Sequence, residues 1–279
     1  RKLIALTKQL NAVEMMVSNE KIGVTTQKRT PEIIISLTSY PARIRYVSQT
    51  LNRLMNQTVK PDRIILWLSK EQFPEGERNL PFRLHEMKKR GLQIEWCEKD
   101  IKAYKKLIPA LERYPEAIII TVDDDLVYDV DLIENLIDCH VMYPTAIIAS
   151  RVHKIKFLDN GAIAAYSEWE KEISTDAWVP RQDLFVTGGA GTLFPPHIFN
   201  DEVFNSEVFQ KECPYADDIW INVMARLSKC TIVHTGKNRT LTYVPGTQED
   251  RLFAININKN DEQLGKLVTR YGENIFKLD

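Results

Sequence analysis

The chain has 279 residues, of which 44% are hydrophobic and 27% are charged. These proportions are ordinary for a globular protein, so they exclude a collagen-like, disordered or low-complexity chain. Its 37 basic and 38 acidic residues give a formal net charge of −1, which argues against a nucleic-acid-binding protein because such proteins usually carry a basic excess.

The first 30 residues differ from the rest of the chain. Apolar residues there recur at intervals of three and four, as in the seam of a coiled coil: Leu3, Leu6, Leu10, Val13 and Val17. The pattern predicts an amphipathic helix over 1–22, followed by a polar connector that ends at residue 30. We expect this unit to join a domain formed by 31–279 to another part of a larger, multidomain polymer-building enzyme. The alternative is a helix that folds back on its own domain.

From Pro31 on, short β-branched runs alternate with helical patterns. Strands are predicted at 33–37, 63–68, 92–97, 117–122, 146–150, 184–187 and 231–234, with another short strand ending at Pro195. Helices are predicted at 44–55, 103–113, 132–141 and 217–227. This alternation predicts a three-layer α/β/α sandwich with a mainly parallel central sheet.

The cysteines and the apolar runs bear on the cellular compartment. The four cysteines are Cys97, Cys139, Cys213 and Cys230. They include no CxxC pair, so the sequence predicts neither a zinc site nor a disulfide framework. The apolar run at 117–122 is far shorter than the ~20 residues needed to span a bilayer. We therefore expect reduced thiols in a cytoplasmic protein.

Three consecutive carboxylates, Asp123, Asp124 and Asp125, directly follow the most hydrophobic predicted strand. Ligands of open α/β sheets bind beyond the carboxyl ends of the strands. Adjacent carboxylates repel one another unless a cation or hydrogen-bond donors compensate them, and Mg²⁺ or Mn²⁺ takes carboxylate and phosphate oxygens together. The segment predicts a metal–diphosphate site. The alternative is an acidic loop or the first turn of a helix.

A second acidic pair, Asp217 and Asp218, opens the predicted helix at 217–227. A carboxylate placed there could accept a proton from an acceptor hydroxyl, whereas the simpler explanation is N-capping of the helix. Basic residues that could contact a pyrophosphate are Arg43, Lys105 and Lys106, although the lysines could equally form a solvated face.

Five segments, taken in order, resemble a known family. They are SLTSYPAR at 36–43, QTVKPDRI at 57–64, KKL at 105–107, VDDD at 122–125 and ADDIW at 216–220. Over about residues 31–235 the chain resembles bacterial glycosyltransferases of the GT-A fold, and more narrowly the sugar transferases of capsule and lipopolysaccharide gene clusters. The resemblance implies a GT-A-like sandwich with a DxD motif.

The resemblance also implies roles for individual residues. Asp125 would ligate Mn²⁺ or Mg²⁺, and Asp123 would hold the donor ribose or the metal through water. His234 matches a further metal ligand, although a lone histidine there is more often packed or on the surface. Asp218 matches the general base of inverting relatives, but the pair here is Asp-Asp rather than Glu-Asp, which leaves the choice between Asp217 and Asp218 open.

Two further sets of residues complete the expected site. The donor-binding set is Thr38, Tyr40, Arg43, Asp100, Lys105, Lys106, Asp123 and Asp124. The acceptor-side set is Gly188, Gly189 and Trp220, with Tyr166, Trp169, Trp178 and the 194–196 segment as further surfaces or, alternatively, ordinary core. The glycine-rich turn at 188–191 is not a GxGxxG motif, so we expect it to approach the sugar or acceptor closely rather than to bind a dinucleotide.

The acidic segments together predict a metal-dependent transferase acting on a nucleotide-diphosphate donor, and the resemblance implies a glycosyltransferase that moves a sugar, with inversion, to a glycan hydroxyl in bacterial surface polysaccharide synthesis. We expect a UDP-linked donor, a glycan or lipid-linked glycan acceptor and no nucleic acid. We also expect peripheral contact with the inner membrane or with other domains. A sugar nucleotidyltransferase and a catalytically silent GT-A-like glycan-binding domain remain as alternatives.

Overall fold

The computed structural model describes residues 21–237, 241–248 and 259–276. All but the last two residues of the predicted helix at 1–22 lie outside these ranges, so its connector role stays a prediction. Among the described residues, no helix is long and apolar enough to cross a membrane. All four cysteines are free thiols, as expected.

A seven-stranded sheet forms the centre of the fold. In spatial order its strands are β3 (Leu92–Cys97), β2 (Arg63–Ser69), β1 (Ile33–Thr38), β4 (Ile118–Thr121), β8 (Thr192–Phe194), β5 (Ile147–Ala149) and β9 (Ile232–His234). Strand β8 runs antiparallel to both of its neighbours, and the other neighbouring pairs are parallel. The predicted mainly parallel α/β sheet is therefore confirmed.

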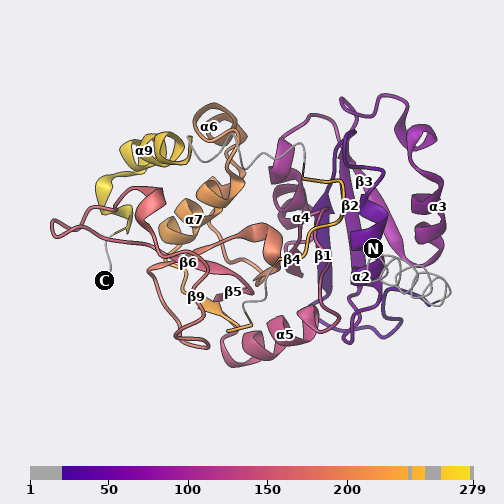
Figure 1. Cartoon of the computed structure of the whole chain (residues 1–279), viewed down its shortest axis with the longest axis horizontal. Helices are drawn as coiled ribbons and strands as arrows, with labels where there is room; N and C mark the ends of the chain where they lie inside the picture. Colours follow the sequence, from indigo (N-terminus) through magenta and orange to yellow (C-terminus); the bar gives the residue numbers. More distant parts are fainter. Residues whose placement is uncertain (1–20, 238–240, 249–258, 277–279) are drawn as a thin grey trace, which may run out of the picture.

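Helices cover both faces of this sheet (Figure 1). Along β1, Ile33, Ile35 and Leu37 face one side and Ile34 faces the other, as the two-residue period of a strand requires. The first side packs against α2 (Val47–Met55), α3 (Phe82–Lys89) and α5 (Leu132–Met142), and the second against α4 (Ile108–Arg113) and α7 (Asp217–Leu227).

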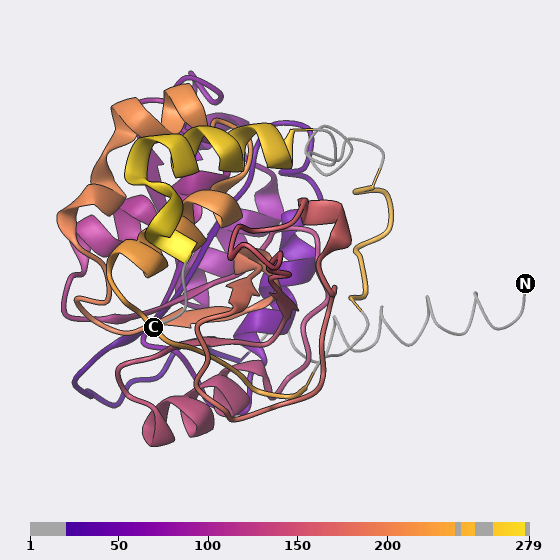
Figure 2. The same ribbon diagram turned by 90° about the vertical axis from the view of Figure 1, so that its left-hand side faces the viewer.

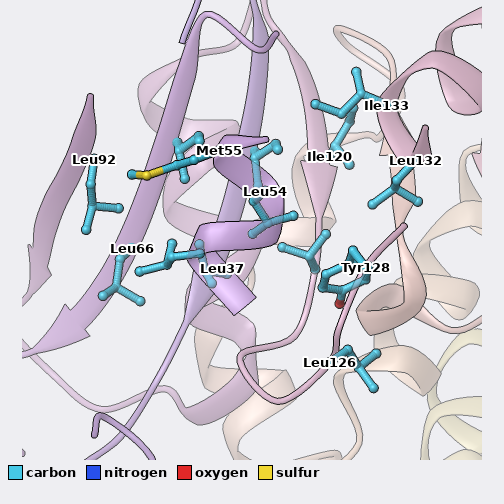
Figure 3. Close-up of a cluster of buried hydrophobic side chains, with 14 of the residues drawn as sticks. Leu37, Leu54, Met55, Leu66, Leu92, Ile120, Leu126, Tyr128, Leu132 and Ile133 are labelled. Carbon is cyan, nitrogen blue, oxygen red and sulfur yellow. The ribbon is translucent and has the colours of Figure 1, made fainter. Parts of the chain in front are cut away.

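Figure 3 shows part of the core on the first side, where Leu37 and Leu66 of the strands lie beside Leu54 and Met55 of α2. None of these four side chains is exposed to solvent. Burying a side chain of this size contributes about 1.5–3 kcal/mol to folding. This core holds β1, β2 and α2 as one rigid unit, which fixes the carboxyl ends of the first strands.

Further helices pack on the side of α7 that faces away from the sheet. Helices α6 (Ser206–Glu212) and α9 (Asn260–Tyr271) lie against it, with α9 drawn in yellow in Figure 2. Trp220 of α7 fills the space between them, with ring centroids 5.7 Å from Phe209 and 6.3 Å from Tyr271. The first residues of α7 are thus held by contacts on both sides of the helix.

Some elements differ from the sequence prediction. The helix expected at 103–113 is divided into a 3₁₀ turn, η2 (Lys102–Lys106), and α4, because Pro109 lacks an amide hydrogen and fits only in the first turn of a helix. The run at 184–187 forms β7 (Leu184–Val186), which leaves the main sheet and pairs with β6 (Val152–Lys154).

The sequence analysis did not predict α3, α6 or α9, since each is short or mostly polar. The 3₁₀ turns η1 (Gly76–Asn79), η3 (Tyr166–Glu168), η4 (Gly188–Ala190), η5 (Asp201–Phe204) and η6 (Glu273–Phe276) complete the described elements.

Candidate active site

The acidic segment at the end of β4 is held by the turn that precedes β8. The backbone N–H of Asp123 donates to the carbonyl oxygen of Gly189 at 3.1 Å and to the hydroxyl oxygen of Tyr128 at 2.7 Å. The Tyr128 hydroxyl in turn donates to the Gly189 carbonyl. These bonds fix the loop backbone, so the three carboxylates leave it in different directions.

Asp124 is neutralised inside the protein. Arg43, in the loop after β1, places Nη1 at 2.9 Å from Asp124 Oδ1, and Ser39 Oγ donates to Asp124 Oδ2 at 2.5 Å. Because Asp124 is buried and fully engaged, its carboxylate anchors the loop after β1 to the loop after β4.

Asp125 is less well compensated. Arg43 Nη1 lies 3.0 Å from Asp125 Oδ2, and Gln248 Nε2 donates to the same oxygen at 3.0 Å. Burial and then the charge of Asp123 raise the pKa of Asp125 to about 6, against the lowering effect of Arg43. Negative charge around Asp125 is therefore incompletely compensated, which makes its carboxylate a suitable ligand for a cation.

Lys106, at the end of η2, joins the acidic segment to α7. Its Nζ lies 2.9 Å from Asp123 Oδ1 and 3.0 Å from Asp217 Oδ2, and its side chain is buried. Burial disfavours the charged ammonium, but Asp123 and Asp217 outweigh this effect and raise the pKa of Lys106. Lys106 is therefore a charged residue that is enclosed between two carboxylates.

The first turn of α7 carries the second acidic pair. Asp217 is buried against Lys106, whereas Asp218 is half-buried and its Oδ1 accepts a hydrogen bond of 2.8 Å from the N–H of Gly188. Burial and then the charge of Asp217 raise the pKa of Asp218 to about 7. At neutral pH Asp218 can therefore both accept and release a proton.

The glycine turn lies where the two acidic segments meet. A Cβ atom on Gly189 would stand 1.7 Å from Asp123 Oδ2, and one on Gly188 would stand 3.2 Å from Asp218 Oδ1. In the structure the glycine turn lies close to these two carboxylates, and its predicted approach to the sugar or acceptor stays a prediction. Only glycine at residue 189 leaves room for Asp123 in its present position.

The donor set of this site suits a hard divalent cation. Five carboxylates, of residues 123–125, 217 and 218, face the two cations Arg43 and Lys106, so negative charge remains in excess. Among the described residues, no group of three or more His, Cys, Asp or Glu side chains is placed to hold a metal ion by protein ligands alone. A cation such as Mg²⁺ commonly takes only one or two protein carboxylates together with substrate phosphates, which fits Asp125 and Asp123.

The chain is similar to known proteins in its structure. No protein-family model matches it, and no curated protein matches its sequence significantly. Among solved structures, it is similar to the mannosyltransferase PcManGT from Pyrobaculum calidifontis in complex with GDP-Man and Mn²⁺, with a TM-score of 0.50 and 13% identity over 98% of this chain and 77% of that one. This likeness shows a GT-A-like fold.

Two other solved structures match with lower TM-scores. S. aureus TarS 1–349 in complex with UDP has a TM-score of 0.44 and 11% identity, over 86% of this chain and 71% of that one. The 4-diphosphocytidyl-2C-methyl-D-erythritol synthase from Anaerococcus prevotii has a TM-score of 0.44 and 13% identity, over 82% of this chain and 98% of that one.

Other members of the predicted donor set lie along the same edge of the sheet. Asp100 is paired with Lys105 and accepts a hydrogen bond of 2.8 Å from Gln72 Nε2, beyond the carboxyl ends of β2 and β3. The Thr38 hydroxyl is bonded to the carbonyl of Trp67 at 2.8 Å. Tyr40 lies under the guanidinium of Arg43, 5.6 Å from the ring centroid.

The structure corrects two predicted site residues. His234 is buried, its Nε2 lies 2.6 Å from the Thr175 carbonyl and its Nδ1 accepts from the N–H of Gly236, so neither nitrogen is available for a metal. Trp220 has no exposed surface, and its indole N–H donates to the carbonyl of Val203. It is a core residue of α7 and does not face an acceptor.

The other aromatic residues divide between core and site. Trp169 and Phe194 are buried in the hydrophobic clusters, and Trp178 is partly exposed with its indole N–H on the carbonyl of Thr235. Tyr166 lies close enough to Asp218 for that carboxylate to add to the effect of burial, and together they raise the pKa of the Tyr166 hydroxyl.

Sequence reasoning missed Ser39, Tyr128 and Gln248 as members of the site. Ser39 lies within the quoted 36–43 segment and could have been chosen there. Gln248 reaches Asp125 only because the segment 241–248 returns across the acidic loop, where Val244 N donates to the Asp125 carbonyl at 2.7 Å. Nothing in the local sequence indicates that return.

Proposed function

We propose that this protein is a glycosyltransferase that transfers a sugar from a nucleoside-diphosphate donor to a hydroxyl group of a glycan. One observation carries the proposal: the acidic loop after β4 and the acidic start of α7 meet at Lys106 and the Gly188–Gly189 turn. A site for a diphosphate and a site for a proton acceptor therefore lie side by side, as sugar transfer to a hydroxyl requires.

The donor end of the proposed site is the edge formed by the loops after β1, β2, β3 and β4. Asp125, with Asp123, would hold Mn²⁺ or Mg²⁺; a bound cation neutralises charge on the leaving diphosphate as a Lewis acid. The similar mannosyltransferase was solved with GDP-Man and Mn²⁺, which supports a divalent cation bound together with a nucleotide-sugar donor. Arg43, Tyr40, Thr38 and the Asp100–Lys105 pair would hold the nucleotide.

The acceptor end would use Asp218 as the base. Its carboxylate is oriented by the N–H of Gly188, and its pKa of about 7 suits proton transfer at neutral pH. Asp218 would take the proton of the acceptor hydroxyl while that oxygen attacks the anomeric carbon on the face opposite the diphosphate. The new bond then has inverted configuration. Tyr166 would line the approach of the acceptor.

The finer parts of the proposal come from the sequence resemblance. They are a UDP-linked donor, a glycan or lipid-linked glycan acceptor, and a role in bacterial surface polysaccharide synthesis. A lipid-linked acceptor would bring the protein to the inner face of the cytoplasmic membrane. Each of these points is open to direct test with defined donors and acceptors.

A ligand screen followed by a product assay tests the proposal. UDP-, GDP-, dTDP- and CMP-linked sugars are added with and without Mn²⁺, and the melting temperature is measured, because a ligand of the native state raises its stability. We expect one donor class, UDP-linked, to raise it only with Mn²⁺ and then to be hydrolysed slowly. Formation of a nucleotide sugar from a nucleoside triphosphate and a sugar phosphate would instead show a nucleotidyltransferase.

A further inference from the structure

Lys106 occupies an unusual place between the two ends of the site. Only 4% of its surface is exposed, and its ammonium is within 3.0 Å of both Asp123 and Asp217. Asp123 belongs to the loop after β4, and Asp217 is the first residue of α7. Among the described ion pairs, this is the one that ties the proposed donor loop to the helix bearing the proposed base.

The backbone around Lys106 is fixed as well. Ser36 Oγ, in the centre of β1, donates to the Lys106 carbonyl at 2.5 Å, and the indole N–H of Trp67 donates to the same hydroxyl at 2.9 Å. The ammonium therefore projects from a rigid base in the sheet. A lysine that reaches out to bind a diphosphate would need a mobile, accessible head, which Lys106 does not have.

The two carboxylates at the start of α7, Asp217 and Asp218, differ in their burial and in their binding partners. Asp217 is 8% exposed and ion-paired with Lys106, while Asp218 is half-buried and bonded to the N–H of Gly188. The carboxylate of Asp217 is therefore buried and engaged by the Lys106 ammonium. The carboxylate of Asp218 is not part of this ion pair and stays available to an acceptor hydroxyl.

We propose that Lys106 is a positioning residue: by pairing with Asp123 and Asp217 it holds the start of α7 against the donor loop and leaves Asp218 as the carboxylate that meets the acceptor. This inference rests on the proposed function. It replaces the expectation that Lys106 contacts the diphosphate, and within this proposal Asp218 rather than Asp217 is the base.

The test separates positioning from donor binding. In Lys106→Met, kcat for transfer at saturating donor should fall at least 100-fold, as when a general base is misplaced. The dissociation constant of the nucleotide sugar should change less than threefold. A dissociation constant weakened tenfold or more, with kcat unchanged, would show that Lys106 is a direct donor ligand and would overturn the proposal.

Two variants guard against a merely structural effect. Arg90→Met removes another buried cation, one bonded to the Lys21 carbonyl and Asn52 Oδ1 away from the site, and it should lower stability while leaving kcat unchanged. Lys106→Arg keeps the charge but changes its shape, so its kcat should lie between those of the wild type and Lys106→Met. If Lys106→Met does not fold, a wild-type kcat in Lys106→Arg would overturn the proposal.

A double-mutant cycle tests the ion pair without any enzyme assay. Melting temperatures are measured for Lys106→Met, Asp217→Asn and the double variant. The losses should be clearly non-additive, because either single change breaks the same contact. Additive losses would overturn the proposal. If the cycle shows coupling but the wild type acts on no nucleotide sugar, the proposed function fails and the ion pair stands.

Discussion

The strands β3, β2, β1 and β4 are longer than β8, β5 and β9, and only the second group includes a strand, β8, that runs against the direction of the others. The first four contain four to seven residues and run parallel, whereas the last three contain three residues each and include the antiparallel β8. The first region presents the ends of four strands at one edge. The second brings a glycine turn and the start of α7 to meet that edge.

The two regions also compensate their carboxylates differently. In the first region, Asp124 is neutralised by Arg43 and Ser39. In the second, Asp218 has a backbone N–H as its hydrogen-bond partner and a pKa raised to about 7. Under the proposed function, the parallel region would supply a fixed frame for a ligand, and the mixed region would supply a group that can exchange a proton.

The largest expected effect on the transfer rate comes from removing the carboxylate of Asp218. Asp218→Asn should lower the transfer rate on the order of 10²–10⁴-fold, because an amide cannot take the acceptor proton. Donor affinity, measured by calorimetry, should stay close to that of the wild type. A variant with normal turnover would assign the base to another residue and remove the distinction drawn between the two regions.

A smaller loss of activity should follow from a side chain at Gly189, where the glycine turn of the mixed region meets Asp123 of the parallel region. In Gly189→Ala the new methyl group would collide with the Asp123 carboxylate, and a displacement of about 1 Å can cost on the order of 100-fold in rate. Initial rates measure this effect. Gly265→Ala in α9 is the matched control, since its Cβ would meet open space and activity should not change.

Donor binding by the parallel region should depend on the proposed cation, whereas the role of Asp218 in the mixed region should not. With donor present at 100 times its dissociation constant, Mn²⁺ should add about 2.7 kcal/mol of stability, seen as a rise of several degrees in melting temperature. Asp125→Asn should lose this rise, and Asp218→Asn should keep it. Equal donor binding with EDTA and with Mn²⁺ would contradict the role given to Asp125.

Activity should depend on pH through the mixed region. A base with a pKa of about 7 must lose its proton to act, so kcat/KM should increase with pH up to about 7 and then level off. Below this value the rate should fall about tenfold for each pH unit. A profile that is flat from pH 5.5 to 8 would show that the titration of Asp218 does not control the reaction.

The smallest effect on function is expected at the far edge of the sheet. His234→Ala leaves buried backbone groups without partners, at a cost of about 1–3 kcal/mol in the free energy of unfolding. Denaturant titration measures this loss. The Mn²⁺ dependence of donor binding should remain unchanged, and a weakened dependence would restore His234 as a metal ligand.

Much of the parallel region could be predicted from local sequence. The runs at 33–37 and 63–68 are strands whose apolar residues are buried on both faces of the sheet, and the run at 92–97 is the edge strand, in which Leu92 is buried and the other residues are half-buried. The helix at 217–227 was also predicted with its bounds, since its apolar residues recur at helical spacing on the face that packs against the core. In the mixed region, the run at 184–187 looks like any other core strand, yet it pairs outside the main sheet.

The sequence by itself determined the fold class, the placement of Asp123–Asp125 after a buried strand, and the start of α7 at Asp217. Only the tertiary structure decided that Lys106 joins Asp123 to Asp217, that Gln248 returns to Asp125, and that His234 and Trp220 are committed elsewhere. The physical reason is that apolar periodicity is a local property of the chain. Charge compensation depends instead on which distant groups packing brings within about 3 Å of one another.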